Sequence, residues 1–122
     1  MNIETVAILS PGEMGGAVGG AFAKHGFTVI TALAGRSDAT RERALAVGFR
    51  DGGTLPEIVA AADIVLSIMP PEHAPAQAEA VAAAMKQTGH TPPYADCNAV
   101  SPETAKSIGA VFAEIGADFI DG

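Results

Sequence analysis

The residues whose types and spacing suit a chemical task stand directly after the first apolar run of the chain, residues 5–9. This run leads into a glycine turn and then into a helix-compatible stretch. Such a turn presents unpaired helical N–H groups to an anion, and its glycines let the backbone approach a pyrophosphate where a Cβ would collide. The complete pattern is G-x-G-x-x-G, and a serine stands at its first glycine. We therefore predict a dinucleotide pyrophosphate site, with an ordinary glycine-rich turn as the alternative, over Ser10, Pro11, Gly12, Glu13, Met14 and Gly15.

A second group of interest follows the next apolar run, residues 27–31. Arg36 lies about 20 residues past the turn, where a nucleotide-binding α/β unit places the group that contacts the adenosine ribose. Its guanidinium is a permanently charged planar fork that suits a 2′-phosphate, and Ser37 adds a hydroxyl donor. No acidic residue lies between Thr28 and Ser37. We therefore expect NADP(H) to be bound in preference to NAD(H), with Gly35, Arg36 and Ser37 in the site. The alternative is a solvated Arg36 beside a Ser37 that only caps the next helix.

Alternating apolar runs and helical stretches must position these groups. The alternation is typical of βαβ units and of a parallel sheet. Strands are expected at residues 3–9, 28–31, 49–51, 63–69, 94–97 and 118–120, and helices at 14–25, 38–47, 54–61, 72–87 and 101–115. The predicted fold class is α/β, with residues 1–122 forming one Rossmann-type, doubly wound parallel sheet of about six strands and helices on both faces.

Bulk composition limits the classes of partner. The chain of 122 residues has a net charge of −7, and its seven Lys and Arg residues are scattered, which argues against a nucleic-acid partner. The single cysteine, Cys97, rules out an intrachain disulfide and is typical of a reducing compartment. No apolar run approaches the ~18 residues that span a bilayer, and no secretory signal precedes the first strand. We expect a cytoplasmic domain without a membrane partner and, from the spacing of His, Cys and Asp, without a metal site.

On these segments, the sequence resembles the N-terminal NAD(P)-binding domain of the β-hydroxyacid dehydrogenase superfamily. That superfamily includes 6-phosphogluconate dehydrogenase, 3-hydroxyisobutyrate dehydrogenase and imine-reducing relatives. Residues 10–15 resemble its G-x-G-x-M-G turn, and residues 35–37 resemble the Asn-Arg-Thr signature of its NADP-using members. Residues 96–102 resemble its D-x-S-T-x-x-P substrate motif, and residues 119–122 resemble the start of its D-A-P-V-S-G-G segment. Residues 64–71 resemble the strand and loop along the nicotinamide ribose, which end in Met69, Pro70 and Pro71.

The resemblance implies an oxidoreductase that transfers a hydride between NADP(H) and a small hydroxyacid-like substrate. In the superfamily, the Ser-Thr pair of the substrate motif binds the substrate carboxylate. Asn98 and Ala99 stand at those positions, and Asn98 alone keeps a polar donor there, so we expect it to contact both cofactor and substrate. The resemblance also implies a helical C-terminal domain that carries the catalytic lysine and forms a homodimer. No lysine of this chain matches that segment, so residues 1–122 are expected to bind cofactor and to hold no catalytic residue.

Two other functions remain open on the residues. An S-adenosylmethionine-dependent methyltransferase domain has the same architecture but places an acidic residue after the second strand, where Arg36 stands. A non-enzymatic NADPH-sensing module requires a natural end at Gly122.

Cys97 and His73 are two further residues near the expected site. Cys97 lacks a neighbouring base in the sequence, so a buried packing role is expected for it rather than nucleophilic chemistry. His73 opens a helix near the expected cofactor and is expected mainly to be structural.

Overall fold

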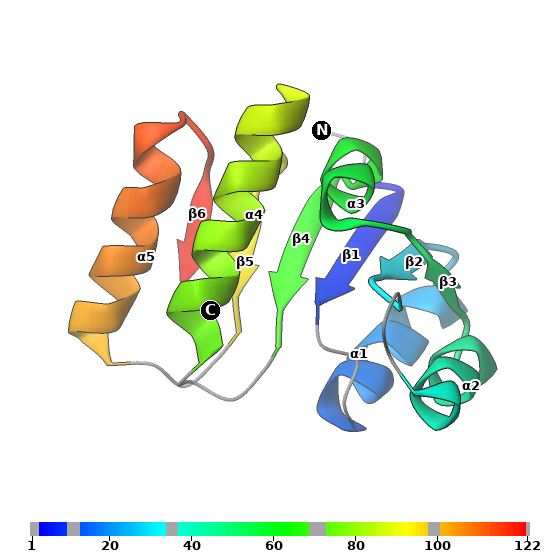
Figure 1. The fold of residues 1–122 in the computed structure, drawn as a ribbon. Coiled ribbons are helices and arrows are strands. Elements are labelled where there is room, and N and C mark those ends of the chain that lie inside the picture. Colours follow the sequence, from blue (N-terminus) through cyan, green and yellow to red (C-terminus); the bar gives the residue numbers. More distant parts are fainter. Residues whose placement is uncertain (1–2, 10–12, 34–36, 69–72, 98–100, 122) are drawn as a thin grey trace.

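Six parallel strands in the order β3-β2-β1-β4-β5-β6 form the centre of the computed structural model (Figure 1). The structure describes residues 3–9, 13–33, 37–68, 73–97 and 101–121. The strand order and the surrounding helices confirm the predicted Rossmann-type α/β fold. Along the chain the elements are β1 (Thr5–Leu9), α1 (Glu13–Lys24), β2 (Thr28–Thr31), α2 (Asp38–Ala46), β3 (Phe49–Asp51), α3 (Leu55–Ala61), β4 (Ile64–Ser67), α4 (Ala74–Thr88), β5 (Tyr94–Asp96), α5 (Pro102–Glu114) and β6 (Phe119–Asp121).

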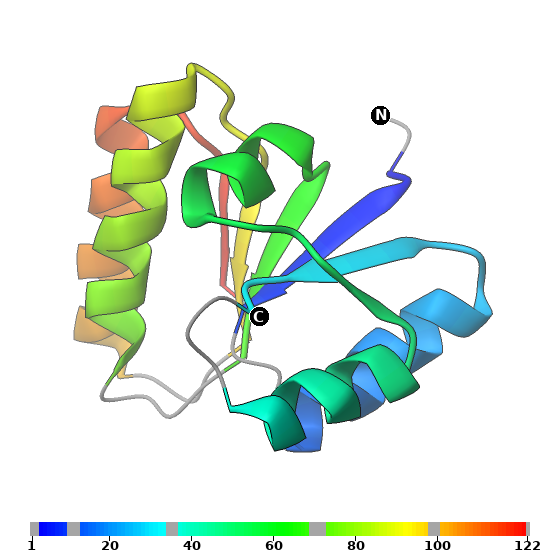
Figure 2. The same ribbon diagram turned by 45° about the vertical axis from the view of Figure 1, so that its right-hand side comes forward.

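Helices cover both faces of the sheet and bury two separate apolar clusters. Side chains from α1 and α2 pack on one face with Val6 and Ile8 of β1. Helices α3, α4 and α5 cover the other face (Figure 2). Their side chains pack there with Ala7 and Leu9 of the same strand. Successive residues of a strand point to opposite faces, so a strand covered on both faces must be apolar throughout. This explains why β1 is an almost unbroken apolar run.

The order of the strands reverses between β1 and β4, which lie side by side. The last residues of neighbouring strands are in register, because Leu9 pairs with Ser67, Ser67 with Asp96, and Asp96 with Asp121. The carboxyl ends of β1, β4, β5 and β6 therefore form one edge. In open α/β sheets, ligands bind outside this edge at the point of reversal. The loops that the sequence predicts to hold a nucleotide follow strands that end here.

The structure shifts several predicted boundaries by a few residues. Asp63 was expected to open a strand but lies just before β4, where its carboxylate accepts the backbone N–H groups of Glu4 and Thr5, both at 2.9 Å. The strand predicted at 63–69 is Ile64–Ser67. Helix α4 extends to Thr88 and ends at Gly89, whose φ of 74° is the left-handed conformation that glycine adopts without strain.

Candidate functional site

Buried polar side chains gather at the carboxyl edge of the sheet. Thr31, Ser67 and Asp96 are each 0% exposed, and each is the last residue of its strand. Burying a polar group is unfavourable unless it gains partners, so polar residues are normally rare inside a core. Their occurrence at strand ends concentrates polarity where the fold binds ligands.

Aromatic side chains pack beside the β4–β5 part of the sheet. Ser67 and Asp96 are register partners on adjacent strands, and Tyr94 lies two residues before Asp96 on β5. Tyr94 is fully buried and stacks on Phe112 of α5, with 4.3 Å between the ring centroids. Burial raises the pKa of Tyr94 to about 12; the Ser67 side chain opposes this rise, and the charges of Asp96 and Cys97 add to it. The phenol is therefore protonated at neutral pH and cannot act as a base.

The β2 end of the edge has an uncharged polar residue, Thr31. Thr31 ends β2, and its buried hydroxyl oxygen has no hydrogen-bond partner among the described residues. An acidic residue at this end of β2 would repel a 2′-phosphate, and Thr31 carries no charge. The adjoining strand β3 ends at Asp51, the register partner of Thr31.

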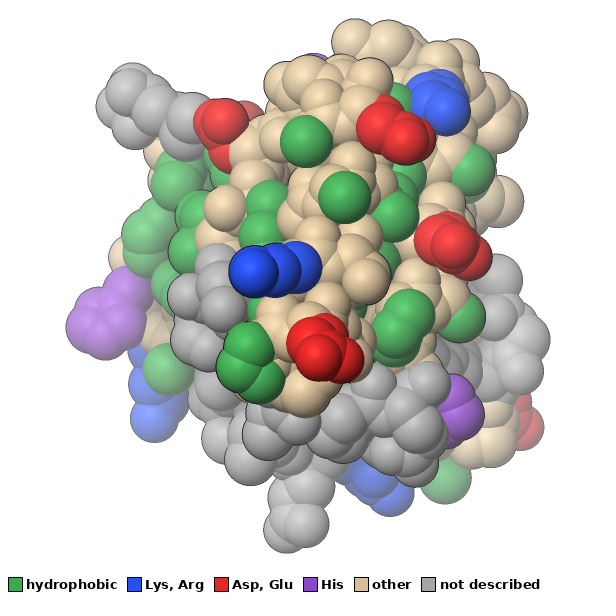
Figure 3. Space-filling model, turned by 90° about the vertical axis from the view of Figure 1, so that its left-hand side faces the viewer, with side chains coloured by type: hydrophobic (Ala, Val, Ile, Leu, Met, Phe, Trp, Pro, Cys, Tyr) green, Lys and Arg blue, Asp and Glu red, His purple; other side chains and the backbone are tan. Residues whose placement is uncertain are grey.

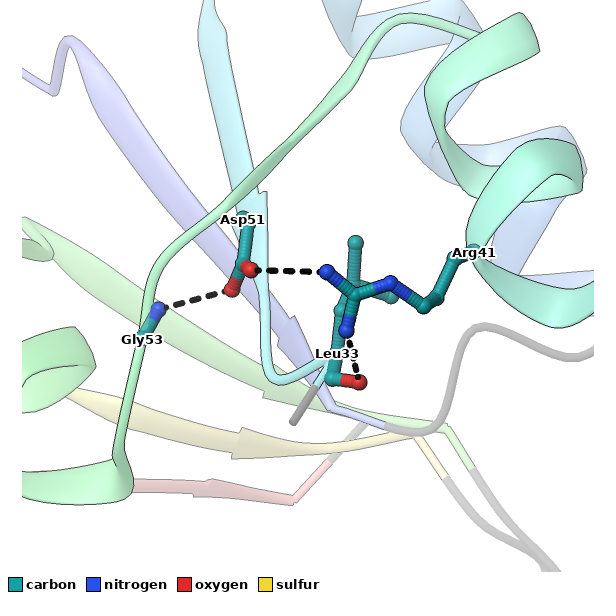
Figure 4. A network of polar contacts seen from close by, with 4 residues as sticks. All are labelled: Leu33, Arg41, Asp51 and Gly53. Atoms are coloured by element: carbon teal, nitrogen blue, oxygen red, sulfur yellow. Dashed lines mark hydrogen bonds and ion pairs between the residues drawn. The ribbon is translucent and has the colours of Figure 1, made fainter. Parts of the chain in front are cut away.

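Arg41 of α2 connects the ends of β2 and β3 (Figure 4). Its Nη1 donates to the carbonyl of Leu33 at 3.0 Å, and its Nη2 lies 3.7 Å from a carboxylate oxygen of Asp51. The other oxygen of Asp51 accepts the backbone N–H of Gly53 at 2.9 Å. Our sequence analysis missed Arg41. The available signal was a cation near the start of a helix, where it opposes the helix dipole and so needs another reason to be there.

Few of the residues predicted for the site lie in the described part of the chain. Glu13, Met14 and Gly15 form the first residues of α1, one residue earlier than predicted. Ser37 caps α2: its hydroxyl accepts the backbone N–H of Thr40 at 3.2 Å and donates to the Thr40 hydroxyl at 3.0 Å. The capping role considered for Ser37 is thus confirmed as its local role. The other predicted residues lie outside the described residues: Ser10, Pro11, Gly12, Gly35, Arg36, Met69, Pro70, Pro71, Asn98 and Ala99.

The predicted burial of Cys97 is wrong. Cys97 is exposed, since β5 ends one residue earlier, at Asp96, although the Cys97 backbone N–H still donates to the Ser67 carbonyl at 3.0 Å. Partial burial raises the pKa of Cys97, and the charge of Asp96 raises it further, so both disfavour the thiolate. His73 is the N-cap of α4 and is exposed, and its side chain forms no capping hydrogen bond.

The described surface also has hollows along α5. A groove of about 250 Å³ lies between α4 and α5, lined by side chains that include Glu79, Lys86 and Glu114. The molecular face around α5 carries acidic and basic side chains scattered among hydrophobic ones (Figure 3). Across the described residues, no three His, Cys, Asp or Glu side chains are placed to hold a metal ion. None of the described helices is both long and apolar enough to span a bilayer.

Comparison with known proteins identifies a family whose profile matches the sequence. Residues 5–122 match the profile described as the NAD binding domain of 6-phosphogluconate dehydrogenase. A conserved protein of unknown function, similar in structure to 3-hydroxyacid dehydrogenases, is 26% identical; the TM-score is 0.77, covering 94% of this chain and 41% of that chain. The 3-hydroxyisobutyrate dehydrogenase of Mycobacterium tuberculosis is 23% identical, with a TM-score of 0.80 over 98% of this chain and 40% of its own. No protein with a curated description matches the sequence.

An imine reductase from Myxococcus stipitatus, solved in complex with NADP+, shares the fold at 20% identity. Its TM-score is 0.78, and the match covers 96% of this chain and 39% of the reductase. The V8 variant of the same reductase was solved in complex with NAD+ and has the same TM-score of 0.78. The chain therefore spans about two fifths of the length of these solved structures. This reductase was thus solved with each of the two cofactors.

Proposed function

We propose that this chain, which belongs to the family of NAD binding domains of 6-phosphogluconate dehydrogenase, binds NADP(H) as the cofactor domain of an oxidoreductase. The reaction is hydride transfer to or from a small hydroxyacid-like substrate. The observation that carries the proposal is the reversal of strand order between β1 and β4, at the end of β1 that precedes the predicted glycine turn. An α/β sheet of this order binds a dinucleotide across the reversal.

The start of α1 supports a pyrophosphate at the turn. The helix begins at Glu13, directly after residues 10–12, and the first N–H groups of a helix have no partner within it. The helix dipole adds a partial positive charge at the same place. Such local donors matter in this protein, because its net charge of −7 opposes the approach of an anionic cofactor.

The charges around the end of β2 support NADP(H) over NAD(H). Arg36 is the cation proposed to hold the 2′-phosphate, together with Gly35 and Ser37. The residue that ends β2 is the neutral Thr31, and the carboxylate of Asp51 on the next strand is offset by Arg41 at 3.7 Å. An uncompensated carboxylate here would favour the ribose hydroxyl of NAD and repel a phosphate.

The nicotinamide end is proposed to lie along the loops after β4 and β5. When bound, the nicotinamide supplies the hydride chemistry, and the protein orients its ring and excludes water. Met69, Pro70 and Pro71 are proposed to flank the nicotinamide ribose, and Asn98 and Ala99 to face the substrate. In this proposal the lysine that moves the proton belongs to a helical C-terminal domain, through which the complete protein forms a cytoplasmic homodimer.

Calorimetric titration with NADPH and NADH tests the proposal directly. We expect tighter binding of NADPH, and we expect Arg36→Ala to lower NADPH affinity by about tenfold to a hundredfold, the usual effect of losing a charged hydrogen-bond partner. The affinity for NADH should be nearly unchanged in the same variant. Equal binding of both nucleotides to the unmodified chain would overturn the NADP preference. Binding of S-adenosylmethionine with neither nucleotide bound would overturn the oxidoreductase assignment.

A further inference from the structure

Three backbone segments meet at the side chain of Arg41. Its guanidinium contacts the Leu33 carbonyl after β2 and the Asp51 carboxylate at the end of β3, while its own backbone lies in α2 (Figure 4). Asp51 extends the connection to Gly53, whose φ of 86° lies in the left-handed region. One side chain thus joins the two strand ends that border the proposed adenosine corner.

The beginning of α2 is bonded to both flanks of residues 34–36. Leu33, the last described residue before this segment, is held by Arg41 through its carbonyl. Ser37, the first described residue after it, is held by Thr40, and its carbonyl accepts the backbone N–H of Arg41 at 3.0 Å. The separation of the two flanks is therefore set by consecutive residues of one helix turn.

Stability alone is a poor reason for an arginine at this position. Arg41 and Asp51 each have side chains 42% exposed, and an ion pair with that exposure at 3.7 Å contributes little to folding. A cation near the start of a helix also opposes the helix dipole. The contact that stands out is the partly buried hydrogen bond to the Leu33 carbonyl, 3.0 Å long and eight residues away in sequence.

We propose that Arg41 is a positioning residue that sets the cofactor preference by fixing the two flanks of residues 34–36. It acts through Arg36, because fixed flanks at Leu33 and Ser37 lower the entropy that the chain loses when it binds the 2′-phosphate. The nucleotide part of this inference rests on the proposed function; the fixing of the flanks does not. Asp51 orients the Arg41 guanidinium toward the Leu33 carbonyl and so supports the same positioning role.

Arg41→Met tests the role, with Arg43→Met as the matched control. Both arginines belong to α2 and both changes remove one positive charge, but Arg43 is exposed and has no contact with Leu33 or Asp51 in the described structure. We expect Arg41→Met to weaken NADPH binding about fivefold, or about 1 kcal/mol, and NADH binding less than twofold. Arg43→Met should change neither by more than about twofold. Equal losses in the two variants would reduce the effect to general charge and overturn the proposal.

Two further variants separate positioning from direct phosphate contact. In an Arg36→Ala background, Arg41→Met should cause no additional loss of NADPH affinity, because Arg41 acts through Arg36. A second fivefold loss in that background would mean that Arg41 binds the phosphate itself. Arg41→Lys keeps the charge but not the planar fork that reaches two acceptors at once. Full recovery of the preference by lysine would also overturn the positioning role.

Amide hydrogen exchange without nucleotide separates this inference from the proposed function. Two backbone amides report on the flanks: that of Gly52 donates to the Thr31 carbonyl at 2.8 Å, and that of residue 41 donates to the Ser37 carbonyl at 3.0 Å. We expect Arg41→Met to speed the exchange of both amides, while Arg43→Met leaves them unchanged. Unchanged exchange in Arg41→Met would overturn the positioning role whatever the chain binds. Absence of binding of either nucleotide to the unmodified chain, with faster exchange in the variant, would overturn the proposed function and the nucleotide part of this inference, but not the fixing of the flanks.

Discussion

The two halves of the sheet are built differently around one shared edge. In the β4–β6 half, Tyr94, Phe112 and Phe119 stack in parallel between strands and α5, with 4.3 Å and 6.1 Å between successive centroids. In the β1–β3 half, α1 approaches β3 so closely that Gly19 lies against Phe49, and a half-exposed ion pair joins α2 to β3. The first half adds a stack of buried rings to its apolar core, and the second adds a close approach at a glycine and a half-exposed ion pair.

This difference has a functional consequence under the proposed function. Exposed charges contribute little to folding, so those at the adenosine end can change without unfolding the domain. Buried polar groups beneath aromatic rings cannot change as freely, because an unpaired buried partner is strongly destabilising. The cofactor preference should therefore be adjustable in the β1–β3 half, while the nicotinamide half is fixed by its core.

The largest expected effect is in the aromatic stack. Phe112→Ala should lower the free energy of unfolding by about 3–5 kcal/mol, because a fully buried ring is lost and leaves a cavity beside Tyr94. Phe22→Ala is the matched control: Phe22 is only partly buried and forms an edge-to-face pair with Phe27 in the other half. Urea unfolding followed by circular dichroism measures both. A loss for Phe22→Ala as large as that for Phe112→Ala would contradict the contrast between the halves.

A smaller loss of stability is expected where α1 meets β3, and it comes from overpacking rather than from a cavity. A Cβ on Gly19 would lie 1.8 Å from the Phe49 ring, so Gly19→Ala should destabilise the protein by about 1–3 kcal/mol through overpacking. At the neighbouring Gly20 the nearest atom outside the helix is 3.8 Å away, the carbonyl oxygen of Val47. Gly20→Ala should therefore stabilise by about 0.5–1 kcal/mol through its helix propensity. Thermal unfolding should show a lower melting temperature for Gly19→Ala and a higher one for Gly20→Ala. Shifts of the same sign would contradict the close approach of α1 to β3.

Sequence reasoning was strong where a signal is local and weak where partners are distant in sequence. Apolar periodicity and caps such as Ser101 predicted each strand and helix to within a few residues, because these signals act over single turns. The exposure of Cys97 depended on where β5 ends, and strand ends are set by pairing with distant strands. The contact of Arg41 with Asp51 joins two elements through the fold, so it could not be deduced from spacing alone. Most of the predicted site remains a prediction, since it lies outside the described residues.

The last prediction concerns the ionisation of the only tyrosine of the chain, Tyr94. Its effect on stability is the smallest at neutral pH and becomes visible only in alkali. Burial raises its pKa to about 12, whereas an unfolded tyrosine titrates near pH ~10. Because the folded pKa is the higher one, the contribution of this group to stability is complete below the unfolded pKa and is lost as the pH rises through the folded value. Absorbance at 295 nm should therefore show almost no phenolate in the folded protein at pH 10.5, and about three quarters ionisation once denaturant is added. Ionisation of the folded chain near pH 10 would mean that the ring is open to water, and that the β4–β6 half is no more closed than its neighbour.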